Sequence, residues 1–258
     1  MTVISIVTAV YNRADTIADA MRSVQGQTYA EIEHLVQDGG STDGTLEIVR
    51  QLSTARTQVE SGRDAGIYDA LNRGIARATG DVLGLLHSDD VFAHPGVLAN
   101  VARLFEDAEI GGVYGDLEYV AKADPSQVIR YWKAGHYRPE LLRKGWMPPH
   151  PTLFLRRELF ARHGAYDTEF RIAADYEAIL RWLTAGQIRL AYLPEVLVKM
   201  RVGGESNRSL ERILRKSRED LRAIRRHEIG GVGVLAAKNL SKVTQFLRRD
   251  RTTTFKVD

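Results

Sequence analysis

The chain has 258 residues, enough for one large domain with a substantial core, or for one domain with an appendage. Its composition, 44% hydrophobic and 27% charged residues, is ordinary for a soluble globular protein. It contains no cysteine, which excludes disulfides and thiolate metal sites and suits a reducing compartment.

The net charge of +3 hides an asymmetry between the two ends of the chain. Residues 199–258 hold 16 Lys/Arg and 7 Asp/Glu, a balance of +9, whereas residues 1–198 have a balance of −6. The C-terminal part is therefore expected to meet something anionic. No apolar stretch approaches the roughly 18 residues of a spanning helix, and residues 1–12 lack the basic start of a signal peptide. We expect a cytoplasmic protein that is not integral to a membrane.

The N-terminal part of the chain alternates predicted strands with predicted helices. A continuous β-branched run at 3–10 predicts a strand that is buried on both faces. Apolar runs and helical spacings then predict, in chain order, helix 17–24, strand 32–36, helix 45–52, a weak strand at 59, helix 66–79, strand 82–86 and helix 95–106. Such alternation is typical of βαβ units and a parallel sheet, so the sequence predicts an α/β fold.

The second half of the chain is less regular. Residues 122–149 are poor in periodicity. On either side of them, the pattern predicts strand 113–120, strand 151–155, a short helix 158–162, helix 175–186 and two late strands at 188–192 and 196–200. The sheet is therefore expected to resume beyond the irregular stretch.

Polar residues gather where three predicted strands end, at 8–12, 38–43 and 89–90. In open α/β sheets, ligands bind beyond the carboxyl ends of the strands. At the third position the apolar run 83–86 leads directly into two adjacent carboxylates, which repel each other and resist burial. A turn at the strand end is one interpretation. A divalent cation with a phosphate attached is the other.

Five motifs follow one another along the chain: VTAVYNR (7–13), QDGGSTDGT (37–45), SGRDAGIYDALNRGIARATGD (61–81), HSDDVF (87–92) and AADYEAILRW (173–182). In this order and at these spacings, the chain resembles family 2 inverting glycosyltransferases of the GT-A fold over roughly residues 2–200. The run GIYDALN followed by ATGD is similar to bacterial enzymes that extend lipid-linked or surface polysaccharides. The resemblance implies a Rossmann-like nucleotide-binding half with a mixed, mainly parallel sheet.

The resemblance also implies a site for a nucleotide-sugar donor. In the family, the loop after the first strand and the acid after the second strand hold the uridine, and charged residues at positions equivalent to 63–64 reach the base or the diphosphate. The full set of implied donor-binding residues is Thr8, Tyr11, Asn12, Asp38, Arg63, Asp64, Asn72, Ser88 and Asp89.

Each of these segments has an interpretation without a ligand as well. The GGSTDGT stretch can form a turn and a helix that is capped by Thr42 or Asp43. Arg63 and Asp64 can lie in a solvated loop, and Asn72 can simply cap a turn. The residues alone leave both interpretations open.

The HSDD segment aligns with the metal motif of the family, often written D-x-D or D-x-D-D. Mn²⁺ and Mg²⁺ prefer oxygen ligands and typically take one or two protein carboxylates plus substrate phosphates. The resemblance therefore implies that Asp90 and Asp89 hold Mn²⁺ or Mg²⁺, which counters the charge of the leaving nucleoside diphosphate. His87 stands where the family often has an acid, so it either ligates the metal or hydrogen-bonds the ribose.

Inversion needs a general base that removes a proton from the acceptor hydroxyl. The family places this base at an acid that opens a late helix, which points to Asp175, with Glu177 as the competing carboxylate. Asp175 can instead be the N-cap of helix 176–185. His150 lies in an implied acceptor-side loop, where it contacts the diphosphate or the acceptor, or has a structural role.

Two basic amphipathic helices are predicted near the C-terminus, at 209–227 and 234–249. Such helices suit the headgroup layer of an anionic membrane, which would hold the protein on the inner face of the cell membrane, close to a lipid-linked acceptor. Alternatively, they pack on the catalytic domain or form a homo-oligomer. We expect no nucleic-acid partner, because no reader motif or aromatic platform accompanies the basic residues.

These observations predict one catalytic domain with a helical appendage. The GT-A domain is expected at 1–204, with a nucleotide-sugar-binding half at 1–115 and an acceptor half at 116–204, followed by the basic helical segment 205–258. The predicted function is metal-dependent, inverting transfer of a hexose from a nucleotide-sugar, a UDP-sugar, to a hydroxyl of a glycolipid or polysaccharide acceptor. One alternative is a sugar-phosphate nucleotidyltransferase, although its Gly-rich basic loop is missing. The other is an inactive donor-binding scaffold.

Overall fold

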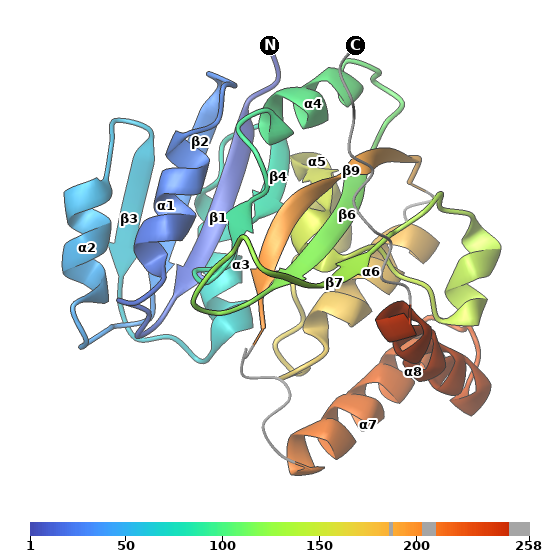
Figure 1. Ribbon diagram of the computed structural model, residues 1–258. Coiled ribbons are helices and arrows are strands. Elements are labelled where there is room, and N and C mark those ends of the chain that lie inside the picture. The colour runs from blue at the N-terminus through green and yellow to red at the C-terminus, as the bar shows by residue number, and fades with distance from the viewer. Residues whose placement is uncertain (186–187, 203–209, 248–258) are drawn as a thin grey trace.

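The computed structural model describes residues 1–185, 188–202 and 210–247 (Figure 1). Its strands are β1 (Ile4–Val10), β2 (Ile32–Asp38), β3 (Thr57–Ser61), β4 (Val82–Leu85), β5 (Val91–Phe92), β6 (Gly112–Val120), β7 (Val128–Trp132), β8 (Phe154–Arg156) and β9 (Leu190–Arg201). Its α-helices are α1 (Ile17–Gln25), α2 (Thr45–Leu52), α3 (Ile67–Arg77), α4 (Val97–Leu104), α5 (Arg157–His163), α6 (Ala174–Ala185), α7 (Leu210–Arg226) and α8 (Val232–Leu247). Two 3-10 helices are η1 (Pro139–Lys144) and η2 (His150–Thr152).

The strands found in the described residues form one sheet in the order β3-β2-β1-β4-β8-β6-β9-β5, with β7 paired to β6. The strands β3, β2, β1 and β4 are mutually parallel, as expected where helices connect successive strands. Beyond β4 the sheet is mixed, because β8 is antiparallel to both β4 and β6 while β6 and β9 are parallel. The predicted α/β fold with a mixed sheet is confirmed.

Helices cover both faces of this sheet, and β1 is buried along its whole length. Ile4 and Ile6 pack with side chains of α1 and α4 on one face. Val7 and Ala9 pack with α3 and α6 on the other face. The alternation of a β-strand therefore gives β1 a hydrophobic environment on both sides, which explains its uninterrupted apolar sequence.

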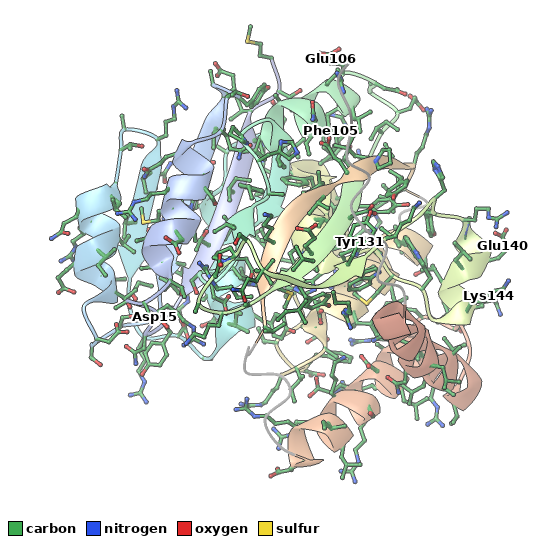
Figure 2. The ribbon with its side chains drawn as sticks, in the orientation of Figure 1. Asp15, Phe105, Glu106, Tyr131, Glu140 and Lys144 are labelled. Atoms are coloured by element: carbon green, nitrogen blue, oxygen red, sulfur yellow. The ribbon has the colours of Figure 1, made fainter. Side chains whose placement is uncertain are left out.

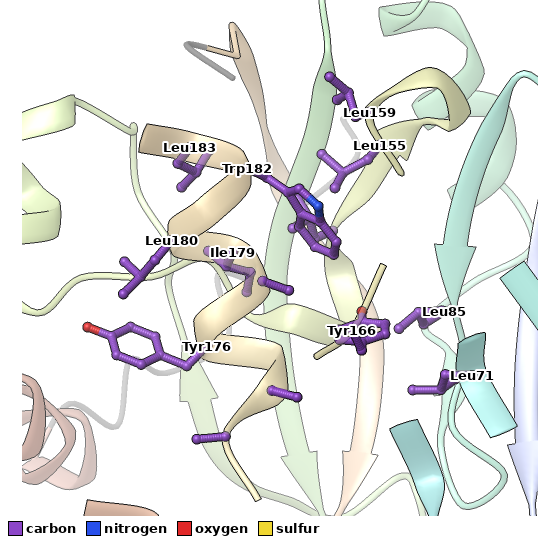
Figure 3. Close-up of a cluster of buried hydrophobic side chains, with 14 of the residues drawn as sticks. Leu71, Leu85, Leu155, Leu159, Tyr166, Tyr176, Ile179, Leu180, Trp182 and Leu183 are labelled. Carbon is purple, nitrogen blue, oxygen red and sulfur yellow. The ribbon is translucent and has the colours of Figure 1, made fainter. Parts of the chain in front are cut away.

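The larger hydrophobic cluster is built around α6 (Figure 3). Trp182 of α6 packs edge-on against Tyr166, with 5.7 Å between ring centroids, and its indole N–H donates to the Gly164 carbonyl oxygen at 3.0 Å. Tyr166 in turn lies beside Leu71 and Leu85. These contacts fix α6 against the sheet, with its first turn at the edge where the parallel strands end.

The structure corrects two boundaries in the second half. The prediction of a strand at 151–155 is wrong over its first residues, because the chain forms η2 there and β8 begins at Phe154. Proline at residue 151 has no N–H for a sheet ladder, which favours the turn. The two late strands predicted at 188–192 and 196–200 are one strand, β9, whose register against β6 shifts between them.

The irregular stretch 122–149 contains two elements that periodicity did not reveal, β7 and η1. β7 is exposed or half-buried at every position, so it lacks the apolar alternation of a buried strand. The predicted helix 175–186 is α6, although residue 186 itself lies outside the described ranges.

The two C-terminal helices lie together against α6 and η1 (Figure 1). Ala223 and Ile224 of α7 are buried, whereas Ile213 and Leu214 are exposed. The predicted boundary between 204 and 205, and the outer ends of the two predicted helices, lie outside the described residues. Within those residues, no helix combines the length and apolarity that crossing a membrane requires.

Close packing between α3 and β1 makes Gly74 sensitive to substitution. A Cβ at Gly74 would collide with Cγ1 of the buried Val7. We expect Gly74→Ala to lower the free energy of unfolding by about 1–3 kcal/mol, although alanine favours helices. The same change at Gly233 in α8, where a Cβ meets no atom within 4 Å, is expected to raise it by up to about 1 kcal/mol. Denaturant unfolding of both variants checks this pair, and a stabilised Gly74→Ala protein would contradict it.

Candidate active site

The candidate site lies at one edge of the sheet, where the parallel strands β1, β2 and β4 end. In Figure 2, Asp15, in the loop after β1, marks this edge, and Phe105, after α4, marks the opposite one. The three polar clusters of the sequence follow these strands, and the structure brings the loops after β1, β2 and β3 into contact.

Asn12 joins the loop after β1 to the loop after β2. Its φ of 49° is in the left-handed region, which asparagine tolerates better than most residues. Its backbone N–H donates to Ser41 Oγ at 2.9 Å, and its side-chain oxygen accepts from the Thr42 N–H, also at 2.9 Å. Both hydrogen bonds hold the loop after β1 against the loop after β2.

Asp38 and Thr8 are buried beneath these loops rather than exposed on them. One carboxylate oxygen of Asp38 accepts from the N–H groups of Gly40 and Ser41, at 3.0 and 3.1 Å, and from Ser61 Oγ at 2.6 Å. Thr8 Oγ1 lies 3.1 Å from Nε2 of the buried His34. Asp38 therefore supports the loop after β2 from inside, whereas Thr8 links β1 to β2.

Tyr11 and Asp64 lie against Gly39, and the backbone of Arg63 lies against Gly40, on the outer side of the same loops. A Cβ at Gly39 would lie 2.5 Å from Asp64 Oδ2 and 3.4 Å from Tyr11 Cδ2, so only glycine permits this approach. Asp64 Oδ1 also accepts from the Gly66 N–H at 2.9 Å. Tyr11 is 58% exposed and Arg63 is exposed, so an aromatic face and a cation are open to a ligand here.

Two predicted donor residues are occupied elsewhere. Asn72 makes a two-point contact with the backbone of Tyr166, donating to its carbonyl oxygen at 2.8 Å and accepting from its N–H at 2.9 Å. This contact ties α3 to the segment before α6. Ser88 is 7% exposed and lies within the strand-end turn.

Asp43, considered as a helix cap, links the same loops. Its carboxylate accepts from the backbone N–H of Thr45 at 3.0 Å, at the start of α2, and from the Ala14 N–H at 3.1 Å. The hydrogen bond from Thr45 contributes to the lowered pKa of the Asp43 carboxyl. The N-cap position of α2 is Gly44, with no side-chain capping bond, so the capping interpretation of this residue is wrong: Asp43 lies one position earlier and holds the loop instead.

The acid pair is organised by Arg201, the last residue of β9. Its backbone N–H donates to Asp90 Oδ1 at 3.1 Å, and its guanidinium donates to the Asp89 carbonyl oxygen at 2.8 Å and to Asp19 Oδ2 at 2.6 Å. Asp90 is 1% exposed. Burial and the neighbouring charge of Asp89 raise the pKa of the Asp90 carboxyl well above its usual range.

The two acids have free oxygen atoms suited to a divalent cation. Asp90 Oδ2 is buried without a hydrogen-bond partner, and the half-buried Asp89 carboxylate accepts no hydrogen bond from the described residues. No group of three or more His, Cys, Asp or Glu in those residues could enclose a metal. Mg²⁺ and Mn²⁺ sites with one or two carboxylates plus substrate phosphates do not need such a group, so the donor set fits.

A chain of three side chains connects the acid motif to α6. His87 Nε2 lies 3.1 Å from His150 Nε2, and His150 Nδ1 lies 3.4 Å from Asp175 Oδ2. Burial lowers the pKa of His150 to about 4, so its imidazole is neutral at pH 7. The structure thus brings together three residues that the sequence separates by 63 and 25 positions.

Asp175 lies in the first turn of α6, with Tyr68 Oη 3.3 Å from its Oδ1. Burial raises the pKa of the Asp175 carboxyl, while the adjacent His150 lowers it. Lys216 and Lys238 of the C-terminal helices lower it further, and the pKa ends below its ordinary value. Asp175 is therefore ionised at neutral pH and has the proton-accepting form of a base.

Glu177 is not placed beside Asp175 and His150. It is 1% exposed and pairs with Arg181 at 3.0 Å and with His227 Nε2 at 3.0 Å. Burial raises the pKa of Glu177, but hydrogen bonds from His227 and Arg181 outweigh it and lower the pKa to about 2. Its carboxylate is committed to contacts within the protein.

Two functional neighbours had no clear sequence signal. Arg201 is distant from the acids along the chain, and its role depends on β9 passing the end of β4. Tyr68 lies in the first turn of α3, and it contacts Asp175. The only available signal was the GIYDALN motif itself.

Solved structures share this architecture. The mannosyltransferase PcManGT of Pyrobaculum calidifontis matches with a TM-score of 0.67 at 21% identity, covering 92% of this chain and 69% of that one. TarS of S. aureus, residues 1–349, matches with a TM-score of 0.62 at 19% identity, covering 99% and 75%. The mixed sheet and its helices therefore form a GT-A fold.

Sequence comparison identifies the family within this fold. Residues 5–164 match the family described as Glycosyl transferase family 2. An uncharacterized glycosyltransferase of Mycobacterium tuberculosis is 35% identical over 187 residues, 69% of this chain and 68% of that protein. A PGL/p-HBAD biosynthesis glycosyltransferase of Mycobacterium bovis is 31% identical over 208 residues, 79% and 78%. The chain belongs to glycosyl transferase family 2.

The buried His34 beneath the donor loops makes stability depend on pH. Burial lowers its pKa from 6.5 to about 4, so the unfolded chain takes up a proton that the folded protein excludes. This contribution to stability is present above pH 6.5 and is lost as the pH falls towards 4. Between pH 7.5 and 5, we expect the free energy of unfolding of wild type to fall by about 2 kcal/mol more than that of His34→Gln.

Denaturant unfolding at the two pH values measures the difference. His150 has a pKa of about 4 as well, but it is present in both proteins and cancels in the comparison. Equal losses in the two proteins would contradict the prediction.

Proposed function

We propose that this glycosyltransferase is a metal-dependent inverting enzyme that moves a hexose from a nucleotide-sugar to a hydroxyl of a lipid-linked or polysaccharide acceptor. The observation that carries the proposal is the chain from His87 through His150 to Asp175, which joins the acid motif to an ionised carboxylate. On this proposal, one edge of the sheet carries both the groups that bind the donor and the group that accepts the proton of the acceptor.

The donor is proposed to be a nucleotide-sugar, with a UDP-sugar as the first candidate. The ring of Tyr11 and the loop at Gly39 offer a surface for the base, and the exposed Arg63 offers a cation for the diphosphate. The buried Asp38 and the half-buried Asn12 hold these loops in place. Two neighbours of the same fold support this assignment, since TarS was solved with UDP and UDP-GlcNAc and PcManGT with GDP-Man and Mn²⁺.

Asp89 and Asp90 are the proposed ligands of Mn²⁺ or Mg²⁺. When bound, the ion would stabilise the negative charge of the leaving nucleoside diphosphate. The raised pKa of Asp90 supports this role, because a nearby cation would favour its ionised form. His87, at the position of the usual acid, is directed to His150, which favours a role in the acceptor half.

Asp175 is the proposed general base. It would accept the proton of the acceptor hydroxyl as that oxygen attacks the anomeric carbon, opposite the departing diphosphate, so that the configuration inverts. Tyr68 and the neutral His150 contact both carboxylate oxygens and would orient them. One relative is named for PGL/p-HBAD biosynthesis, so acceptors of that biosynthesis are the first to test.

Two substitutions separate the proposed roles. Asp89→Ala removes a metal ligand, so it should abolish the metal-dependent part of donor binding. Asp175→Asn keeps the shape of the base but cannot accept the proton, so donor binding should persist while transfer falls about 10²- to 10⁴-fold. Thermal shifts with UDP, GDP, CDP, dTDP and ADP, with and without Mn²⁺ or Mg²⁺, measure binding. Release of the nucleoside diphosphate measures transfer.

Other outcomes would favour other functions. Near-normal transfer by Asp175→Asn would exclude it as the base. Pyrophosphate release from nucleoside triphosphates would indicate a nucleotidyltransferase, and donor binding without turnover over a broad acceptor panel would indicate a scaffold.

We further propose that residues 1–204 form the GT-A domain and that the C-terminal segment 205–258 touches an anionic membrane. Ile213 and Leu214 of α7 are 47% and 60% exposed, and the exposed Arg212 and Arg215 flank them. Apolar side chains among arginines suit the headgroup layer of a membrane rich in anionic lipid.

A double substitution tests this attachment. Ile213→Glu with Leu214→Glu should weaken binding to phosphatidylglycerol-containing vesicles about tenfold or more. The matched control changes Val128 and Ile129 of β7, each 49% exposed, to glutamate, which alters net charge equally at another surface. Vesicle sedimentation measures both, and equal weakening by the two pairs would refute a specific role for α7.

A further inference from the structure

The segment that carries the proposed base into α6 has no regular structure of its own. Residues 164–173 form only bends and turns between α5 and α6. The Ala173 carbonyl oxygen accepts the Glu177 N–H at 3.0 Å, so the helical hydrogen bonds begin there. The backbone N–H groups just before α6 have no acceptor within the helix and need one elsewhere.

Glu219 of α7 supplies that acceptor. Its carboxylate accepts the N–H groups of Arg171 at 3.2 Å, Ile172 at 2.8 Å and Ala173 at 2.9 Å. A negative charge at the N-terminus of a helix is also favourable, because the helix dipole is positive there. One side chain thus holds three consecutive amides, two residues before Asp175.

Further residues of α7 hold the preceding part of the same segment. Arg222 pairs with Glu169 at 2.5 Å, and Arg226 pairs with Asp167 at 2.6 Å. Both guanidinium groups lie over the ring of the buried Phe170, at 4.8 and 5.7 Å. Positions 219, 222 and 226 follow the three- and four-residue spacing of one helix face, so a single face of α7 covers the segment.

α8 fixes α7 in this position. Lys238 of α8 pairs with Asp220 at 2.7 Å and lies 3.1 Å from the ring centroid of Tyr176, next to Asp175 in α6. At Gly145, whose φ is +75°, a Cβ would lie 2.5 Å from the Lys238 backbone nitrogen. This approach brings α8 directly onto the catalytic domain.

We infer that Glu219 is a positioning residue for Asp175, and that the C-terminal helices are therefore part of the catalytic unit. The inference rests on the proposed function, in which Asp175 is the base. Glu219 acts through the backbone at 171–173 rather than by touching donor or acceptor, so its loss should disturb proton transfer and leave donor binding unchanged.

The first test measures the contact without reference to activity. Hydrogen exchange of the amides of Ile172 and Ala173 should be slow in wild type and become faster in Glu219→Ala. Glu211→Ala is the matched control, because Glu211 is on the same helix, is 83% exposed and, among the described residues, pairs with Arg215 at 3.5 Å. Unchanged exchange in Glu219→Ala, in a protein that is folded by its thermal transition, would overturn the inference.

The second test is kinetic, with the full chain and the sugar nucleotide that wild type turns over, and with water or a soluble acceptor. We expect Glu219→Ala to lower kcat about 10- to 100-fold with an unchanged donor affinity, since small displacements of a catalytic group have effects of this size. Glu219→Gln keeps an acceptor oxygen and should give an intermediate rate. Glu211→Ala should match wild type.

A double substitution decides whether Glu219 acts through Asp175. In an Asp175→Asn background, Glu219→Ala should cause little further loss, because the group it positions no longer takes the proton. A full additional loss, or a normal kcat in Glu219→Ala, would overturn the inference. If wild type turns over no sugar nucleotide, the proposed function fails instead, and the exchange experiment still decides the contact.

Discussion

The geometry of the candidate site depends on one buried arginine. Arg201 is 4% exposed at the end of β9, and it contacts Asp90 and Asp89 after β4 as well as Asp19 of α1. A buried guanidinium must satisfy its N–H groups, and here it does so with groups from both halves of the sheet. The ends of β4 and β9 are therefore held in a fixed relation, and the loops that carry His87 and the two acids take their positions from it.

The distribution of charge around Arg201 leaves the acid pair uncompensated. The guanidinium donates to the Asp19 carboxylate but only to the backbone carbonyl of Asp89, and Asp90 receives a backbone N–H. If the arginine neutralised both acids, they would be an internal salt bridge with little need for a cation. Burial and the charge of Asp89 raise the pKa of Asp90 by more than Arg201 lowers it, and one oxygen atom of Asp90 has no hydrogen-bond partner. That electrostatic imbalance is what a divalent cation would correct.

The sequence predicts the first half of the fold well because burial there is periodic. β1 is apolar at nearly every position since both of its faces are covered, and the helix faces follow from residues such as Ala70, Leu71 and Ile75. β7 and η1 were not predicted. The residues of β7 are exposed or half-buried and those of η1 lie in a short turn, so apolar residues do not recur there at a regular spacing.

The sequence predicted which residues make up the candidate site, but not how their side chains contact one another. Strand ends and motif resemblance identified His87, His150 and Asp175, yet no local pattern shows that their side chains form one chain of contacts. That result depends on η2 packing beside β4. In the same way, nothing in a run of charged residues distinguishes Glu219, which holds three amides, from Glu211, which is exposed.

The basic side chains of α7 lie on two sides of the helix. The inner face of α7 meets acids of this same chain, with Arg222 on Glu169 and Arg226 on Asp167, so part of the asymmetry between the two ends is neutralised internally. On the outer side of α7, the exposed Arg212 and Arg215 lie around Leu214. Leu214 and Glu219 are five residues apart, about 7.5 Å along the helix axis. On the proposed assignments, the first turns of α7 would therefore contact the membrane while the middle of the same helix holds the segment before the catalytic base. A rigid helix would then keep the base at a fixed height above the surface that carries a lipid-linked acceptor.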